Sequence, residues 1–496
     1  MNDARTSVDR RRFIGYFASI GLGGTLLPGV LWSAAQDAPA ITPEMVETAA
    51  TLAGVSLPPE AEKAIAAGLT RRGGLLESYR ALREMGLGND TPSALVFNPV
   101  LPGTRPPAGP PLLRTSKVIV AAPRTEEDLA FLPVTHLAAL LKKREVKSVD
   151  LAKLCLERLK RYDPVLHCVV SLTEELALEQ AARADKEIAA GRYRGPLHGI
   201  PWGAKDLLAV KGYKTTFGAS PFKDQTIDRN ATVYERLTEA GAVLVAKLTL
   251  GALAMGDRWF VGPTKSPWDP KNLEQGSSGS SAGPAAAVAA GLVPFAVGSE
   301  TRGSIISPAS RCGVTGLRPS FGRVSRHGAM ALSWTMDKIG PLCRAAEDCA
   351  IVLYAIQGPD GRDNTVLDVP FAWDAGRDVR KLRVGYLKSD VEKEIPDDPK
   401  NPDRVRRMRE TQAFNKASLE AIRGLGVRPV PVELPKPGSG PMDFLLTAEA
   451  AAAFDDLVRS GGLDLMSAEP ERSGWVGAFR LHELVPAVQY IQANRA

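Results

Sequence analysis

The sequence predicts an α/β fold in which a mixed β-sheet is covered by helices on both faces. Beyond residue 195, short apolar segments alternate with amphipathic ones, as in GIPWGAKDLLAV and TVYERLTEAGAVLVAKL. This alternation is typical of strands followed by helices that pack on a sheet. The chain has 496 residues, of which 44% are hydrophobic and 24% charged, so it is long enough to bury a substantial core as a globular protein.

The composition excludes several classes of function. The net charge is +6, but the basic residues are scattered along the chain, so we expect no nucleic-acid partner. The odd number of cysteines, five, and the lack of CxxC spacing predict buried thiols instead of a disulfide framework. The five histidines do not have the spacing of metal ligands, so we expect no metal ion.

The N-terminus is predicted to be a twin-arginine-type signal peptide, residues 1–40. Three arginines, Arg10–Arg12, precede the charge-free segment Phe13–Gln36, and small residues follow. We therefore expect transient contact with the membrane and its translocase, and a periplasmic location. The alternative is an uncleaved membrane anchor, because the segment is long enough to span a bilayer, although glycines and a proline interrupt it. The cleavage position is left open.

Residues 41–115 are predicted to form a helical extension followed by a connector. Apolar residues recur at helical spacing in the first part, whereas the prolines of NPVLPGTRPPAGPP (98–111) preclude regular structure. The main domain is expected from 116 to 496. It begins with long amphipathic helices such as SVDLAKLCLERLKRY, for which Ser148 is the expected N-cap, and TEELALEQAARADKEIAAG, which ends on Gly191.

A lysine at the end of an apolar segment is a candidate base. Lys205 closes the apolar part of GIPWGAKDL, where burial would lower its pKa and leave a neutral amine. The competing interpretation is a lysine at a strand end that pairs with Asp206. The local sequence leaves both interpretations open.

Two turns of small residues are candidates for the rest of a hydrolytic site. GSSGSSAG (Gly276–Gly283) precedes an alanine-rich helical segment, and GSETRGS (Gly298–Ser304) follows the apolar LVPFAV. Small residues allow successive N–H groups to converge on one point, as an oxyanion requires. The competing interpretations are a flexible linker and an ordinary turn. A Ser–His–Asp arrangement is not supported, because neither turn contains a histidine.

Three segments, taken in order, resemble the amidase signature family. They are GPLHGIPWGAKDLL, then GSSAGPAAAVAAGLVPFAVGSETRGSI, then CGVTGLRPSFGRVSRHG with MDKIGPLCRAAEDCAIVL. The resemblance extends from about residue 130 to 435. It implies the amidase signature fold and a Ser–Ser–Lys triad that hydrolyses a carboxylic amide without a metal or an organic cofactor.

The resemblance also implies the role of each residue. Counting back from AAAVAAG selects Ser280, and not Ser277, as the bridging serine, and its spacings to Lys205 and Ser304 then match those of the family. Ser304 is the expected nucleophile, Lys205 the base, and Ser280 the proton relay, which in the family follows a cis peptide. The supporting residues are Gly279, Ser281 and Asp337, and the expected oxyanion hole consists of the backbone N–H groups of Thr301, Arg302, Gly303 and Ser304.

The chain departs from the family around the nucleophile. The family commonly has Asp-x-Gly-Gly-Ser and then Ile-Arg, whereas this chain has ETRGS at 300–304 and Ile306 after Ile305. These differences leave the substrate class open, since Arg302 could narrow the pocket, contact a polar substrate or point outward. Family members usually continue past a helix like LVPAVQYIQANRA, so we expect a shorter variant or a domain that lacks its C-terminal part.

We therefore predict an exported amidase that hydrolyses a small-molecule carboxylic amide to an acid and ammonia or an amine through an acyl-enzyme. One alternative is the glutaminase (A) subunit of a tRNA-dependent amidotransferase, against which the export signal and the helical extension argue. Another is a non-catalytic binding protein on the same fold, against which the retained Lys205, Ser280 and Ser304 argue. A homodimer and the identity of the amide are left open.

Overall fold

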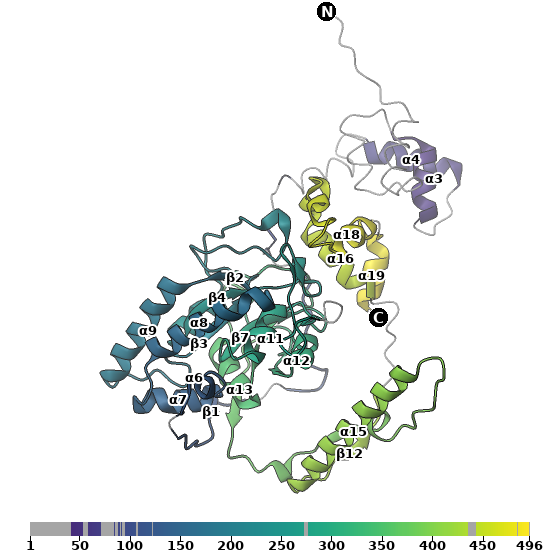
Figure 1. Ribbon diagram of the computed structural model, residues 1–496. Coiled ribbons are helices and arrows are strands. Elements are labelled where there is room, and N and C mark those ends of the chain that lie inside the picture. The colour runs from purple at the N-terminus through teal and green to yellow at the C-terminus, as the bar shows by residue number, and fades with distance from the viewer. Residues whose placement is uncertain are drawn as a thin grey trace, which may run out of the picture. The chain divides into compact units, whose positions relative to one another are not determined.

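The computed structural model describes most of the chain after residue 40 (Figure 1). The predicted signal peptide lies outside the described residues. The described residues are 41–52, 58–70, 84, 88–89, 91, 95–105, 108–121, 123–271, 276–434, 443–483 and 485–495. The chain divides into two units, the larger comprising Met1–Gly109, Val118–Phe371 and Met442–Ala496, and the smaller comprising Pro110–Lys117 and Ala372–Pro441.

A six-stranded sheet forms the centre of the larger unit. Its strands are β2 (Val169–Leu172), β3 (Pro201–Lys205), β4 (Val243–Leu248), β7 (Phe295–Glu300), β8 (Thr315–Gly316) and β9 (Lys338–Cys343). Their spatial order is β2-β4-β3-β7-β9-β8. β3 runs parallel to β4 and β7, whereas β2 is antiparallel to β4, and β9 is antiparallel to β7 and β8. The sheet is mixed and helices cover both of its faces, which confirms the predicted fold class (Figure 1).

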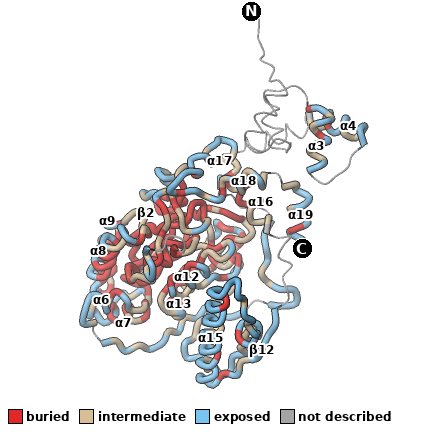
Figure 2. The backbone as a smooth tube through the Cα atoms, turned by 45° about the vertical axis from the view of Figure 1, so that its right-hand side comes forward, coloured by how far each residue is buried: buried red, intermediate tan, exposed pale blue. Residues whose placement is uncertain are grey.

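The central strands are buried because their sequences are almost continuously apolar. Every residue of β3 and β4 is buried, and in β7 only Ser299 is partly exposed. Strands with both faces covered are expected to have such sequences. Figure 2 shows the buried residues concentrated in this part of the unit.

The helices of the larger unit share their core with these strands. Side chains of Leu159, Ala181 and Ala286 form one buried cluster with Val245 and Ala296 of the sheet. All five cysteines are buried and unpaired, as predicted.

A short hairpin in the larger unit pairs β5 (Arg258–Trp259) with β6 (Gly262–Pro263). The α-helices that the structure describes in this unit are α3 (Pro43–Leu52), α4 (Pro59–Thr70), α6 (Glu126–Ala130), α7 (Val134–Lys143), α8 (Ser148–Leu166), α9 (Glu174–Ala189), α10 (Thr232–Glu239), α11 (Ala282–Ala289), α12 (Ile306–Cys312), α13 (Ala346–Ile356), α16 (Asp443–Ala453), α17 (Asp455–Arg459), α18 (Trp475–His482) and α19 (Ala487–Arg495).

The start of α8 differs from its prediction. Ser148 is the first helical residue, the N-cap is Lys147, and the Ser148 hydroxyl donates to the Gly199 carbonyl at 2.8 Å. The N–H groups of Ser148 and Val149 are instead bound by the two carboxylate oxygens of Asp185, at 2.7 and 3.1 Å. A side chain of α9 therefore caps α8, because the two helices pack side by side.

The smaller unit contains two short parallel pairs of strands and a long helix. β1 (Leu112–Arg114) pairs with β10 (Ala372–Asp374), and β11 (Gly385–Leu387) pairs with β12 (Val430–Val432). Between β11 and β12 the chain forms α14 (Lys388–Val391) and α15 (Pro402–Gly424), so this segment has the order strand, helices, strand. Throughout the described parts of both units, no helix combines the length and apolarity needed to cross a membrane.

Candidate active site

Lys205 is placed by β3 inside a cluster of hydroxyl groups. It is the last residue of the strand and its side chain is fully buried. Its Nζ lies 2.8 Å from Oγ of Ser280, 3.1 Å from Oγ of Ser281 and 2.9 Å from Oγ of Ser299. Burial lowers the pKa of Lys205 to about 7, while the nearby carboxylates of Asp337 and Glu300 oppose this shift. A substantial fraction of the amine is therefore neutral at neutral pH.

The neighbouring carboxylate, Asp206, does not pair with Lys205. Its Oδ1 lies 2.6 Å from Nζ of Lys247 on β4, and both side chains are fully buried. Its Oδ2 accepts hydrogen bonds from the N–H and the hydroxyl of Thr216, at 2.8 and 2.6 Å. The interpretation of Lys205 as a strand-end lysine paired with Asp206 is therefore wrong, since a second lysine neutralises that carboxylate.

The first small-residue turn is a buried part of the site and not a linker. Ser277, Ser280 and Ser281 are fully buried, and Ser281 is directly followed by α11. The peptide bond between Gly279 and Ser280 is cis. A Cβ on Gly279 would lie 1.7 Å from the carbonyl oxygen of Gly256, so a side chain has no space here. The turn thus presents Ser280 to Lys205 from a closely packed backbone.

The first three residues of the second predicted turn, Gly298–Glu300, are the end of β7, and residues 301–304 leave the sheet and carry Ser304. The Ser304 carbonyl accepts a hydrogen bond from the N–H of Ser281 at 3.0 Å, which joins the two turns. The buried carboxylate of Glu300 accepts from the N–H groups of Ile305 and Ile306, at 2.8 and 3.0 Å. Glu300, one of the departures from the family, therefore binds backbone N–H groups at the start of α12 that have no acceptor within the helix.

The Ser304 side chain is available for chemistry. It is half-buried, and its hydroxyl has no hydrogen-bond partner among the residues that the structure describes. The N–H groups of Gly303 and Ser304 likewise have no acceptor within the described part of the chain. The hydrogen bond between Ser280 and Ser304 stays a prediction. The Arg302 side chain is exposed, which favours the outward orientation among the three considered.

Asp337 supports the second turn from the residue before β9. It accepts hydrogen bonds from the Thr301 hydroxyl at 2.6 Å and from the N–H groups of Leu332 and Ser333 at 2.8 and 3.0 Å. Burial raises the pKa of this carboxyl group, and the hydrogen bonds oppose that shift. Asp337 thus holds the Thr301 hydroxyl, and its supporting role in catalysis stays a prediction.

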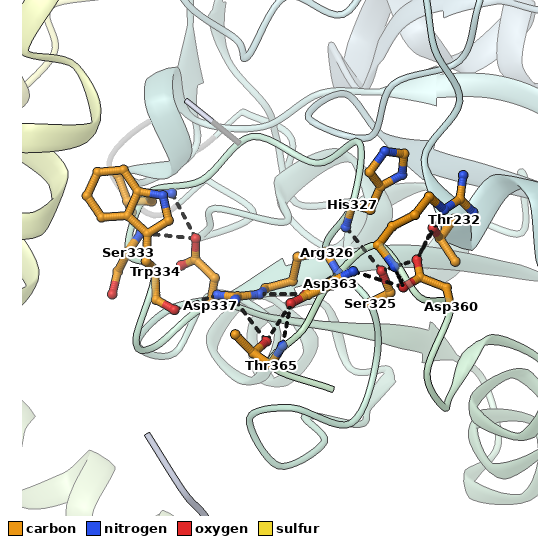
Figure 3. A network of polar contacts seen from close by, with 12 residues as sticks. Thr232, Ser325, Arg326, His327, Ser333, Trp334, Asp337, Asp360, Asp363 and Thr365 are labelled. Atoms are coloured by element: carbon orange, nitrogen blue, oxygen red, sulfur yellow. Dashed lines mark hydrogen bonds and ion pairs between the residues drawn. The ribbon is translucent and has the colours of Figure 1, made fainter. Parts of the chain in front are cut away.

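A pocket opens beside this cluster. Ser299, whose hydroxyl contacts Lys205, and Thr301 are among its lining residues, and apolar side chains such as Leu207 and Met330 form much of its wall. The guanidinium of Arg326 fixes another part of the wall by donating to Asp363, to the Trp334 carbonyl and to Thr365, at 3.2, 2.7 and 3.0 Å (Figure 3).

Sequence reasoning missed two polar residues of the site. Ser299 contacts Lys205 through its hydroxyl and also, at 3.3 Å, through its carbonyl oxygen. Lys338 donates to the Thr301 carbonyl at 2.9 Å. Both residues lie within the quoted segments, next to Glu300 and Asp337, and this adjacency was the available signal.

Comparisons with known proteins identify the family. The family model described as Amidase matches residues 150–489. The A subunit of glutamyl-tRNA(Gln) amidotransferase from Methylococcus capsulatus is 44% identical over 261 residues, which are 51% of this chain and 53% of that protein. The protein of the same name from Geobacter metallireducens is 36% identical over 342 residues, 68% of this chain and 67% of that protein. The chain thus spans about half the length of the first of these relatives.

A solved structure agrees with this assignment. The native peptide amidase of Stenotrophomonas maltophilia superposes with a TM-score of 0.61 at 28% sequence identity, covering 73% of this chain and 78% of that one. The residues matched by the family model include Lys205 and the two turns. The chain belongs to the amidase signature family of hydrolases.

Proposed function

We propose that the protein is an amidase that hydrolyses a carboxylic amide through an acyl-enzyme on Ser304. The observation that carries this proposal is the environment of Lys205. A fully buried amine with a pKa of about 7 contacts Ser280. The next residue of the same turn, Ser281, donates a backbone hydrogen bond to the carbonyl of Ser304. A base with a pKa near the working pH is what general-base catalysis requires.

The proposed reaction begins with attack by the Ser304 oxygen on the amide carbonyl carbon. The Ser304 proton passes to Ser280 while Ser280 gives its own proton to the neutral Nζ of Lys205. The carbonyl oxygen becomes an oxyanion and accepts hydrogen bonds from the backbone N–H groups of the second turn. When the C–N bond breaks, Lys205 returns the proton through Ser280 to the leaving nitrogen. Water then attacks the ester by the same relay and releases the acid.

The lining of the pocket indicates the general class of substrate. Its wall is largely apolar, and its polar residues include Ser299, which contacts Lys205, and Thr301 of the second turn. A pocket of this kind suits an amide with an apolar substituent and its polar group directed towards Ser304. We accordingly propose a small-molecule amide as the substrate.

A second candidate function is suggested by the names of the relatives. Two proteins that are 44% and 36% identical are named as the A subunit of glutamyl-tRNA(Gln) amidotransferase, so this chain is a candidate glutaminase component that works with partner chains. The measurement that separates the two functions is ammonia release by the purified chain from a panel of simple amides and from glutamine. Turnover of simple amides by the chain alone supports the amidase.

The decisive experiment is labelling with a fluorophosphonate probe, followed by mass spectrometry of the modified peptide. The proposal expects the label on Ser304, a large loss of labelling in Lys205→Ala, and none in Ser304→Ala. Lys211→Ala is a matched control, because Lys211 is an exposed lysine that pairs with the exposed Asp228. A folded protein without label would favour the non-catalytic binding protein.

Export to the periplasm through residues 1–40 remains part of the proposal. It is supported by the three arginines and the charge-free segment that follows them.

A further inference from the structure

Lys338 binds the carbonyl group at the base of the second turn. It is the first residue of β9 and lies opposite Glu300, the last residue of β7, in the antiparallel pairing of these strands. Its Nζ donates to the Thr301 carbonyl oxygen at 2.9 Å. Glu300 itself is occupied elsewhere, because its carboxylate binds the N–H groups of Ile305 and Ile306. The Lys338 side chain, which is half-buried, is therefore directed to a backbone group of the turn.

The planar peptide bond transmits this contact to the next residue. The Thr301–Arg302 peptide is not among the cis bonds of the described chain, and in a trans unit the C=O and N–H point in opposite directions. A side chain that fixes the Thr301 oxygen thus also fixes the direction of the Arg302 N–H. This N–H is one of the donors expected for the oxyanion hole.

The other anchors of the turn act at different points. Asp337 binds the Thr301 hydroxyl, Ser307 donates its N–H to the Gly303 carbonyl at 2.8 Å, and Ser281 donates to the Ser304 carbonyl. Gly303 has a φ of 87°, a left-handed conformation that reverses the backbone between these anchors. Among these contacts, that of Lys338 is the one made to the carbonyl oxygen of the peptide between residues 301 and 302.

We propose that Lys338 is a positioning residue of the oxyanion hole, which aims the Arg302 N–H by holding the Thr301 carbonyl. The inference rests on the proposed amidase function. In the tetrahedral intermediate the carbonyl oxygen of the substrate carries the negative charge, and donors that are already aligned stabilise it without reorganisation. The Lys338 ammonium also places a positive charge next to the carbonyl oxygen of the Thr301–Arg302 peptide.

The test uses the full chain and the variant Lys338→Met, which removes the donor and keeps most of the side-chain length. We expect kcat for amide hydrolysis to fall about 10- to 100-fold with KM changed less than about twofold. This is smaller than the 10²–10³-fold loss typical of deleting an oxyanion donor, because the N–H remains but is no longer aimed. Labelling of Ser304 by a fluorophosphonate should slow by a similar factor, since the probe forms a comparable oxyanion.

Two further variants separate positioning from other roles. Lys338→Arg keeps a donor within reach of the Thr301 carbonyl and should restore most of kcat, whereas Lys211→Met, an exposed lysine elsewhere, should leave both rates unchanged. If Lys338→Met unfolds below the assay temperature, Lys338→Gln takes its place. A loss of activity that only follows the unfolded fraction would overturn the proposal in favour of a structural role.

The remaining outcomes distinguish this inference from the proposed function. A raised KM with unchanged kcat would mean that Lys338 contacts the substrate in the pocket, and would overturn positioning. Wild-type labelling and turnover with an equally active Lys338→Met would also overturn it, while the amidase function would stand. If the wild-type chain shows neither label on Ser304 nor turnover, the amidase function fails first and the inference fails with it.

Discussion

The pH dependence of Ser304 labelling is the sharpest consequence of the Lys205 environment. Burial holds the pKa of Lys205 at about 7, against an ordinary value of 10.5. The base must be neutral, so the rate should rise with pH and level off above pH 7. At pH 5, two units below the pKa, about 1% of the lysine is neutral, and the rate constant should be about 100-fold below its plateau.

The magnitude distinguishes this environment from an exposed lysine. With the ordinary pKa of 10.5, only about 0.03% of the amine would be neutral at pH 7, more than about a thousandfold less than for the buried group. The assay is the second-order rate constant of fluorophosphonate labelling between pH 5 and pH 9, where the folded state is confirmed at each pH. Lys205→Met should lose about 10²–10⁴-fold at the plateau and lose the dependence on pH. Lys211→Met should retain the wild-type profile. A rate that is still rising steeply at pH 9, or an inflection that persists in Lys205→Met, would refute the assignment of Lys205 as the base.

Three other predictions concern the backbone, the buried ion pair and the signal. Gly279→Ala places a Cβ 1.7 Å from the Gly256 carbonyl oxygen, so thermal unfolding should show a protein that is strongly destabilised or unfolded. An alanine variant with wild-type stability and labelling would contradict the close packing of this turn. Lys247→Met leaves the buried Asp206 without its ion-pair partner and should lower the free energy of unfolding, measured in urea, by about 3–5 kcal/mol. The double variant Lys247→Met/Asp206→Leu should recover much of this loss. Equal losses in both variants would show that packing, and not charge, dominates. Residues 1–40 fused to a reporter should direct it to the periplasm, and replacement of Arg10 and Arg11 by lysine should block export; a reporter that stays in the cytoplasm in both cases would refute the signal.

The sequence was sufficient to predict features that are local. The apolar sequence of β3 and the helix–strand order around β4 and β7 follow from patterns within single segments, and the structure has them as expected. The positions of Lys205, Ser280 and Ser304 followed from spacing within a family motif. The structure brings Lys205 and Ser280 to 2.8 Å, and a backbone hydrogen bond joins the two serine turns.

Contacts between strands and helices could not be predicted from local patterns. The partner of Asp206 is Lys247, because the parallel register of β3 and β4 sets Ala204 beside Lys247. The contact of Lys338 with the second turn likewise depends on the pairing of β7 with β9. The prediction of Ser148 as the N-cap of α8 was wrong for the same reason. The neighbouring helix α9 supplies the Asp185 carboxylate, which the intrinsic preference of residues for cap positions does not predict.

The absence of a direct carboxylate partner for Lys205, within the described residues, has a consequence for how the site responds to dissolved salt. Its proton affinity is set first by removal from water, and added ions screen this effect far less than they screen an exposed pair such as Lys211 and Asp228. The midpoint of its titration should therefore stay nearly constant from dilute to concentrated salt. The base would thus keep the same proton equilibrium when the salt concentration of the medium changes.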